Sequence, residues 1–224
     1  MFDLGFDVLF MGRNFIRLLL GAGVALKISV ISVALSVVFG TVLGVLGKKR
    51  NCILRAAIGL YVEIMRIVPQ MVMLFIVFFG ATRAFGWHIS AELASLVVFT
   101  LWGSAEMGDL VRGAIDSLPA HQYESALALG LSERDVISYV ILPQAVRRLI
   151  PLSINLATRM IKTTSLVLMI GVVEVLKVAQ QIIEANRTSS PNAAFGVYLA
   201  VFVIYFLMCW PIGVGAKALE RKFG

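Results

Sequence analysis

The sequence predicts an all-α integral membrane protein with five transmembrane helices, forming a single transmembrane domain over residues 1–224. Hydrophobic residues make up 59% of the chain and its mean hydropathy is +0.91, whereas a soluble domain is about half apolar. The apolar runs are long and lack the alternation expected of β-barrel strands. Because a spanning segment must satisfy its backbone hydrogen bonds without water, such runs indicate helices.

Each expected span is close to the ~20 residues that cross a bilayer. The spans run roughly over residues 24–46, 53–80, 93–114, 149–176 and 193–214. In the second span Pro69 should kink the helix and free a carbonyl near residue 65. In the fourth span Gly171 predicts a break. No internal repeat is found, and five spans are few for enclosing a translocation path. The sequence therefore predicts a half-transporter that must pair with another chain.

The basic residues predict the orientation of the spans. Ten of the 20 fall on one predicted side: Lys48, Lys49, Arg50, Arg55, Arg134, Arg147, Arg148, Lys217, Arg221 and Lys222. Five fall on the other side: Arg13, Arg17, Arg83, Lys177 and Arg187. By the positive-inside rule the richer side is cytoplasmic, with the N-terminus outside and the C-terminus inside. The net charge of +7 is therefore assigned to basic loops rather than to nucleic-acid binding.

The chain shows no catalytic or metal-binding constellation. Cys52 and Cys209 lie at or inside spans and provide no redox framework or metal motif. His88 and His121 are lone loop residues, and no Walker motif is present, so ATP is not expected to bind this chain. The acidic N-terminus has no basic region and no small-residue cleavage site, so no signal peptide is expected.

A patterned loop of about residues 116–148 separates the third and fourth predicted spans. Residues 120–131 read as a short amphipathic helix that ends at Gly130. Ser132, with Asp135 three residues later, predicts the cap of a second helix, which should end before Pro143. The apolar faces of these helices either dock on a partner or pack as a re-entrant hairpin on the chain's own spans.

The spacing of this loop resembles a known signature. Glu124-Ser125-Ala126, three residues, Gly130, nine residues and then Val140-Ile141-Leu142-Pro143 resembles the E-A-A–x3–G–x9–I-x-L-P loop of ATP-binding-cassette (ABC) importer permeases. The resemblance implies the type I ABC importer permease fold and a coupling helix that sits in a groove of the ATPase subunit. The coupling residues it implies are Tyr123, Glu124, Ser125, Ala126, Leu127, Gly130, Leu131, Leu142 and Pro143.

Other segments extend the resemblance over nearly the whole chain. Segments 61–70, 109–115, 141–147 and 162–166 look like segments of polar amino-acid permeases. The departures cluster in spans two and three. Ile67-Val68 and Gln70 differ from the family's residues around Pro69, Asp109 replaces Glu, and Glu106 stands where relatives carry an aromatic residue.

Several ionisable and polar residues lie within the predicted spans, where a charge costs about 2.5–3.5 kcal/mol on insertion scales. The candidate substrate-binding residues are Glu106, Arg66, Pro69, Gln70, Lys162, Thr163, Thr164 and Ser165. The spacing also allows Glu63 to pair with Arg66, and Asp109 with Arg112. For Glu106 two alternatives stay open: it pairs with a cation of another span, or it binds the positive group of a cationic cargo.

Together these observations predict the permease subunit of an ABC importer for polar amino acids in the bacterial inner membrane. The resemblance implies two ATPase subunits carrying ATP and Mg, a second permease chain, and an external substrate-binding protein; no nucleic acid and no cofactor of this chain's own are expected. The alternative is a subunit of an ion-coupled transporter or a gated channel. The sequence leaves open which amino acid is carried and whether the two permeases are identical.

Overall fold

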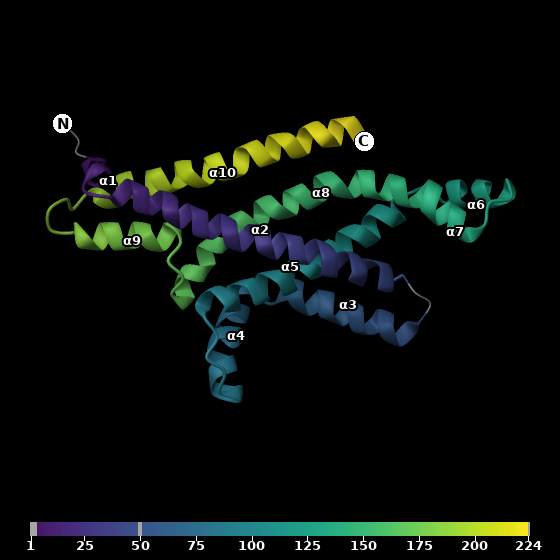
Figure 1. Ribbon diagram of the computed structural model, residues 1–224, viewed down its shortest axis with the longest axis horizontal. Helices are drawn as coiled ribbons and strands as arrows, with labels where there is room; N and C mark the ends of the chain where they lie inside the picture. The colour runs from purple at the N-terminus through teal and green to yellow at the C-terminus, as the bar shows by residue number, and fades with distance from the viewer. Residues whose placement is uncertain (1–3, 49–50, 224) are drawn as a thin grey trace. The chain divides into compact units, whose positions relative to one another are not determined.

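The structure, a computed structural model, describes residues 4–48 and 51–223, and Lys49 and Arg50 of the charge count lie outside them. Every regular element in those residues is helical, which confirms the predicted all-α class (Figure 1). The elements are α1 (Asp7–Phe10), α2 (Asn14–Leu46), α3 (Cys52–Ile67), α4 (Gln70–Phe85), α5 (Ala91–Asp116), α6 (Ala120–Ala128), α7 (Glu133–Asp135), the π-helix η1 (Val136–Ile141), α8 (Leu142–Thr163), the 3₁₀-helix η2 (Thr164–Ile170), α9 (Val175–Ala185) and α10 (Ala193–Phe223).

The chain forms two compact units, each made of three segments. The first comprises Met1–Ser32, Pro69–Phe99 and Thr158–Pro211, and the second comprises Val33–Val68, Thr100–Ala157 and Ile212–Gly224. Long helices such as α2 and α10 contribute to both units. The single transmembrane domain expected over residues 1–224 remains a prediction.

In the first unit, α1, the beginning of α2, α9 and the first part of α10 share one apolar core. Leu18, Ile182 and Val197 are fully buried in it. A Cβ at Gly21 would lie 2.8 Å from the backbone nitrogen of Val175, so only glycine allows α2 to approach α9 this closely. The side chain of Arg17 donates to Gln181 Oε1 over 2.7 Å at the same contact.

Glu174 is fully buried in this unit and caps the N-terminus of α9. Its carboxylate accepts from the backbone N–H groups of Leu176 and Lys177, both at 2.9 Å. The hydroxyl of Tyr205 donates to it from α10 over 3.2 Å. These bonds satisfy the free backbone donors of a helix start, so the carboxylate is a structural cap, which sequence analysis did not single out.

In the second unit, α2 and α5 pack through small residues. A Cβ at Gly44 would lie 2.6 Å from Val111 Cβ, and Gly40 is equally crowded by Met107. This small-xxx-small spacing lets helix backbones approach closely where the surrounding solvent is hydrocarbon. Ile58 and Val62 of α3 pack on the same region.

Two helices in the described residues, α2 and α10, are long and apolar enough to cross a membrane by themselves. The number rises to four if each of two broken pairs, Cys52–Ile67 with Gln70–Ala84 and Glu133–Ile170 with Val175–Ala185, counts as one span. The second half of α5 carries Glu106, Asp109 and Arg112, and this helix is not among those counted. The five-span topology therefore remains a prediction.

Several predicted boundaries differ from those in the structure. α2 begins ten residues before the predicted span. Residues 14–23 pack in the first unit's core, so the helix is longer than the length needed to cross a bilayer. At Pro69 the chain breaks into α3 and α4 instead of kinking, with extended backbone at Val68 and Pro69. The predicted break at Gly171 is confirmed, since its φ is +92° at the end of η2. α10 continues beyond residue 214 to Phe223.

Candidate functional site: a coupling segment and two polar clusters

The first half of the patterned loop is α6, which begins after Pro119. One face of the helix is anchored by Ala126, which is buried, while Glu124 and Ser125 are exposed. The helix ends at Ala128, two residues before Gly130, whose φ of +85° places it in the left-handed region. The predicted helix and its glycine terminator are thus confirmed, with the end two to three residues earlier than expected.

Ser132 caps the second half of the loop as predicted. Its hydroxyl accepts from the backbone N–H of Asp135 over 3.3 Å and donates to the Asp135 carboxylate over 2.6 Å. The prediction that this helix ends before Pro143 is wrong: α7, η1 and α8 follow one another without a gap through Thr163.

The physical reason lies in the π-helical turn before Pro143. Proline has no backbone donor and is tolerated in the first turn of a helix. In η1 the N–H of Leu142 bonds to the carbonyl of Ile137, five residues back, which resets the hydrogen-bond register just before the proline. Within this turn Val136 is fully buried, whereas Ile137 is 52% exposed.

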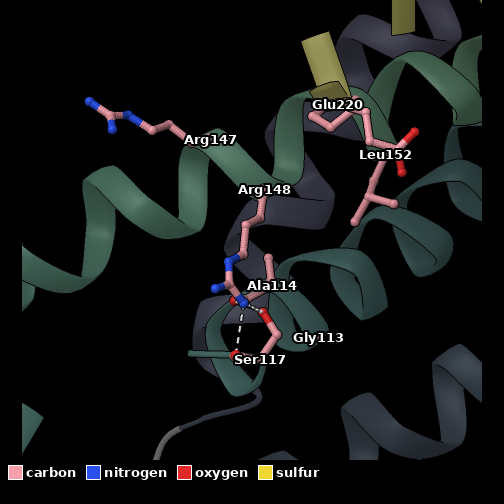
Figure 2. Close-up of a pocket in the computed structure, with 8 residues that line it drawn as sticks. Gly113, Ala114, Ser117, Arg147, Arg148, Leu152 and Glu220 are labelled. Carbon is pink, nitrogen blue, oxygen red and sulfur yellow. Dashed lines mark hydrogen bonds between the residues drawn. The ribbon is translucent and has the colours of Figure 1, made fainter. Parts of the chain in front are cut away.

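Two side-chain contacts brace the loop against its own helices. Gln144 Nε2 donates to Gln122 Oε1 over 2.6 Å and to the carbonyl of Val140 over 2.7 Å. Arg148 Nη1 donates to both the carbonyl and the hydroxyl oxygen of Ser117, each over 2.7 Å, so α8 is tied to the end of α5 (Figure 2). α6 and α7 also pack against η1 at the N-terminal end of α8 (Figure 1).

A cleft of about 360 Å³ opens beside this brace. It is lined by Gly113, Ala114, Ser117, Arg147, Arg148, Pro151, Leu152 and Glu220. Figure 2 shows Arg148 directed to Ser117, whereas Arg147 points away from it. The cleft thus borders the brace between α5 and α8.

The coupling segment, defined here as residues 116–148, exposes much of the predicted set. Glu124, Ser125, Leu127, Gly130, Leu142 and Pro143 are exposed, Tyr123 and Leu131 are partly buried, and Ala126 is buried. Sequence analysis missed Leu129 and Tyr139, which are 82% and 75% exposed. In the sequence these two residues could be recognised only as apolar residues outside the predicted apolar helix faces. This mixed apolar and polar surface, held on a braced scaffold, fits a docking surface for a partner.

A charged cluster joins α3 to α5 within the second unit. Arg66 Nη1 lies 2.8 Å from Asp109 Oδ2, and Arg66 Nε lies 3.4 Å from Glu106 Oε1. Arg112 binds the other oxygen of Asp109 over 2.6 Å, which confirms the predicted Asp109–Arg112 pair. The expected pairing of Arg66 with Glu63 is not what the structure shows, because Arg66 reaches across to α5. The cluster brings together Arg66 and Glu106 from the candidate substrate set.

The remaining candidate substrate residues lie in the first unit. Pro69 and Gln70 form the start of α4, and α4 packs against η2, which contains Thr164 and Ser165. The hydroxyls of Thr163, Thr164 and Ser165 donate to carbonyls of the last turn of α8, leaving oxygen lone pairs to accept. Lys162 is exposed and Thr164 is fully buried. A hydroxyl-rich stretch thus marks the junction of α8 and η2.

Comparison with known proteins identifies the class. Residues 36–224 match the family described as the binding-protein-dependent transport system inner membrane component, and the chain belongs to that family. The match includes the whole coupling segment and both polar clusters.

The relatives and solved structures agree with this assignment. The chain is 32% identical over 203 residues to the glutamine transport system permease GlnP of Escherichia coli K12, covering 90% of each chain. It is 33% identical over 211 residues to the amino-acid ABC transporter permease YckA of Bacillus subtilis, covering 94% of this chain and 91% of the relative. A crystal structure of an amino acid ABC transporter with histidines superimposes with a TM-score of 0.87 at 25% identity, covering 96% of this chain and 98% of that one. The inward-facing MetNI methionine ABC transporter shares the fold, with a TM-score of 0.74 at 20% identity.

These findings confirm the predicted ABC permease fold and the predicted class. The protein is the membrane permease subunit of an ABC importer, located in the inner membrane. It is not an enzyme, because ATP hydrolysis belongs to a separate ATPase subunit, and a substrate-binding protein works with the complex. The alternative of an ion-coupled transporter or channel subunit is not favoured.

Proposed function

We propose that this permease imports polar amino acids and that residues 116–148 couple it to its ATPase. The braced coupling segment carries this proposal, since it exposes Glu124, Ser125 and Leu127 on a helix that ends at a left-handed glycine. The substrate class is supported by relatives named for glutamine and amino acids and by a structural neighbour named as an amino acid transporter.

Coupling requires that movement of a docked ATPase reach the transmembrane helices. The Arg148–Ser117 and Gln144–Gln122 contacts provide such a connection, because they tie the segment to α5 and α8. Closure of the ATPases around ATP would then move the segment as one body and switch the access of the path, rather than deforming α6 alone.

The proposed assembly contains two permease chains and two ATPase subunits. ATP and Mg bind the ATPases, and this chain binds no cofactor of its own. An external binding protein delivers the amino acid. Two permeases are needed because the described helices, even with each broken pair counted as a span, are few for enclosing a translocation path.

The proposed topology has five spans, formed by α2, α3 with α4, α5, α8 with η2, and α10, with the N-terminus outside. Single cysteines at Ser189 and Ser132 test it in a chain whose Cys52 and Cys209 have been replaced. Both serines are exposed, so labelling by an impermeant maleimide reports the side rather than burial. Ser189 should react from outside and Ser132 should not; the reverse pattern would overturn the orientation.

The proposed substrate contacts are Pro69, Gln70, Lys162, Thr163, Thr164 and Ser165 within the first unit, and Arg66 and Glu106 within the second. Backbone freed at a broken helix lines sites in many transporters, which favours the start of α4. The Glu106–Arg66 contact favours an ion pair for that carboxylate, and a cationic cargo remains the second candidate.

Uptake measurements test the proposed function. Membrane vesicles containing the permease, its ATPase and its binding protein should accumulate labelled glutamine. Depleting ATP should abolish uptake, whereas collapsing the proton and sodium gradients at constant ATP should leave it intact. Uptake that follows the ion gradient instead would contradict the assignment, and uptake of none of the polar amino acids would contradict the substrate class.

A further inference from the structure

A second cleft lies in the second unit and shares Gly113 with the cleft beside the Arg148 brace. Its volume is about 490 Å³, and it is lined by Gly47, Lys48, Arg55, Asp109, Arg112, Gly113 and Asp116. The lining comes from the two residues that follow α2, the start of α3 and the end of α5. Three cations therefore face two carboxylates in one depression.

The two carboxylates of this cleft already have cations. Asp109 binds both Arg112 and Arg66, and Asp116 is paired with Lys48. Arg55 makes no ion pair and no hydrogen bond through its guanidinium anywhere in residues 4–48 and 51–223. The cleft thus holds one guanidinium in excess, which attracts an anion.

The position of Arg55 on α3 suggests which anion is available. Ile53, Leu60 and Ile67 are 82%, 61% and 71% exposed and lie along one face of α3, as expected for a lipid-facing helix. Ile58 and Val62 mark the opposite, buried face, to which the helical repeat also assigns Arg55. Arg55 lies in the first turn of α3, so the cleft is at the end of a lipid-facing helix, near headgroup depth.

We propose that this cleft binds the phosphate group of an anionic phospholipid of the cytoplasmic leaflet, with phosphatidylglycerol as the simplest example. Arg55 supplies the planar fork that suits a phosphate, and the Lys48 ammonium adds a donor beside it. Basic pockets next to spanning helices on the cytoplasmic side suit anionic headgroups. The adjoining Lys49 and Arg50 add two positive charges in the sequence.

Native mass spectrometry of the purified transport complex, titrated with phosphatidylglycerol or phosphatidylcholine in mild detergent, tests the proposal. The wild type should retain one phosphatidylglycerol more tightly than any phosphatidylcholine. Arg55→Gln should weaken that retention by about tenfold, the usual effect of losing one charge-assisted hydrogen bond. Arg55→Lys should bind between the two, because the ammonium keeps the charge but lacks the planar fork, and this separates loss of charge from loss of folding.

Arg221→Gln is the matched control, because Arg221 is an exposed arginine on the same predicted side and does not line the cleft. It should bind phosphatidylglycerol as the wild type does. Equal retention of the two lipids by the wild type, or an unchanged affinity in Arg55→Gln, would overturn the proposal. Displacement of the lipid by millimolar inorganic phosphate would assign the cleft to a soluble anion and overturn it as well.

Discussion

The coupling segment and the charged cluster of α3 and α5 belong to the same compact unit but use their polar groups in opposite ways. In the cluster, Arg66, Asp109 and Arg112 satisfy one another within the chain. In the coupling segment one brace bond is part-buried and the other exposed, both join the segment's own helices, and Glu124, Leu129 and Tyr139 are left exposed.

The difference distinguishes residues that stabilise the chain's own fold from residues that are exposed and proposed to contact a partner. A charge in a membrane protein is costly unless paired, so internal pairs are evidence of structure first. An exposed apolar residue on a braced segment has no such internal explanation, which supports the proposed docking role.

The largest effect is expected from Gly130→Asp. At a φ of +85° a side chain costs about 1–2 kcal/mol of backbone strain, although nothing within 4 Å would clash with a Cβ in this chain. The variant should be inserted in the membrane but lose substrate-driven uptake while basal ATP hydrolysis persists. Gly86→Asp is the control, since Gly86 has a φ of +68°, equally open space and a position outside the segment. Wild-type uptake by Gly130→Asp within an intact complex would refute the coupling role.

A smaller loss is expected from Arg148→Gln, which removes both bonds to Ser117. The segment would remain docked but less firmly tied to α5, so uptake per ATP hydrolysed should fall severalfold. Arg147→Gln serves as the control, because this neighbouring exposed arginine points away from Ser117 (Figure 2). Identical coupling ratios in the two variants would show that the brace does not transmit movement.

Breaking the charged cluster should lower the stability of the protein rather than its uptake activity. A double-mutant cycle of Arg66→Gln and Asp109→Asn should give a coupling energy of about 1 kcal/mol, because Arg66 is half exposed and solvent weakens the pair. Thermal unfolding in detergent measures it. The cycle of Arg66→Gln with Glu63→Gln should give nearly zero, and a larger value there would mean that Arg66 prefers its own helix.

The smallest effect on transport is expected from Glu106→Gln. Because Arg66 lies 3.4 Å from this carboxylate, the ratio of arginine to glutamine uptake should stay within about twofold of the wild type. Competition between labelled amino acids in vesicles provides the measurement. A selective fall of tenfold or more in arginine or lysine uptake would instead place Glu106 in contact with a cationic cargo.

Several features of the molecule followed from the sequence because they depend on neighbouring residues alone. Long apolar runs define a membrane protein whatever their packing, and Ser132 caps a helix through an N–H three residues away. Gly130 and Gly171 end helices because their backbone angles suit glycine. The spacing of the motif from Glu124 to Pro143 was readable for the same reason, since it lies within one continuous segment, and its coupling role remains a prediction.

Other features depend on contacts between residues that are far apart in the sequence, and only the folded structure shows them. Arg66 could pair with Glu63 by spacing, yet the approach of α5 offers it two carboxylates instead of one. Pro143 should end a helix by local rules, but a π-helical turn packed against α6 and α7 carries the helix past it. The cleft around Arg55 exists only because α2, α3 and α5 meet. Such contacts join residues tens of positions apart, and no local pattern contains that information.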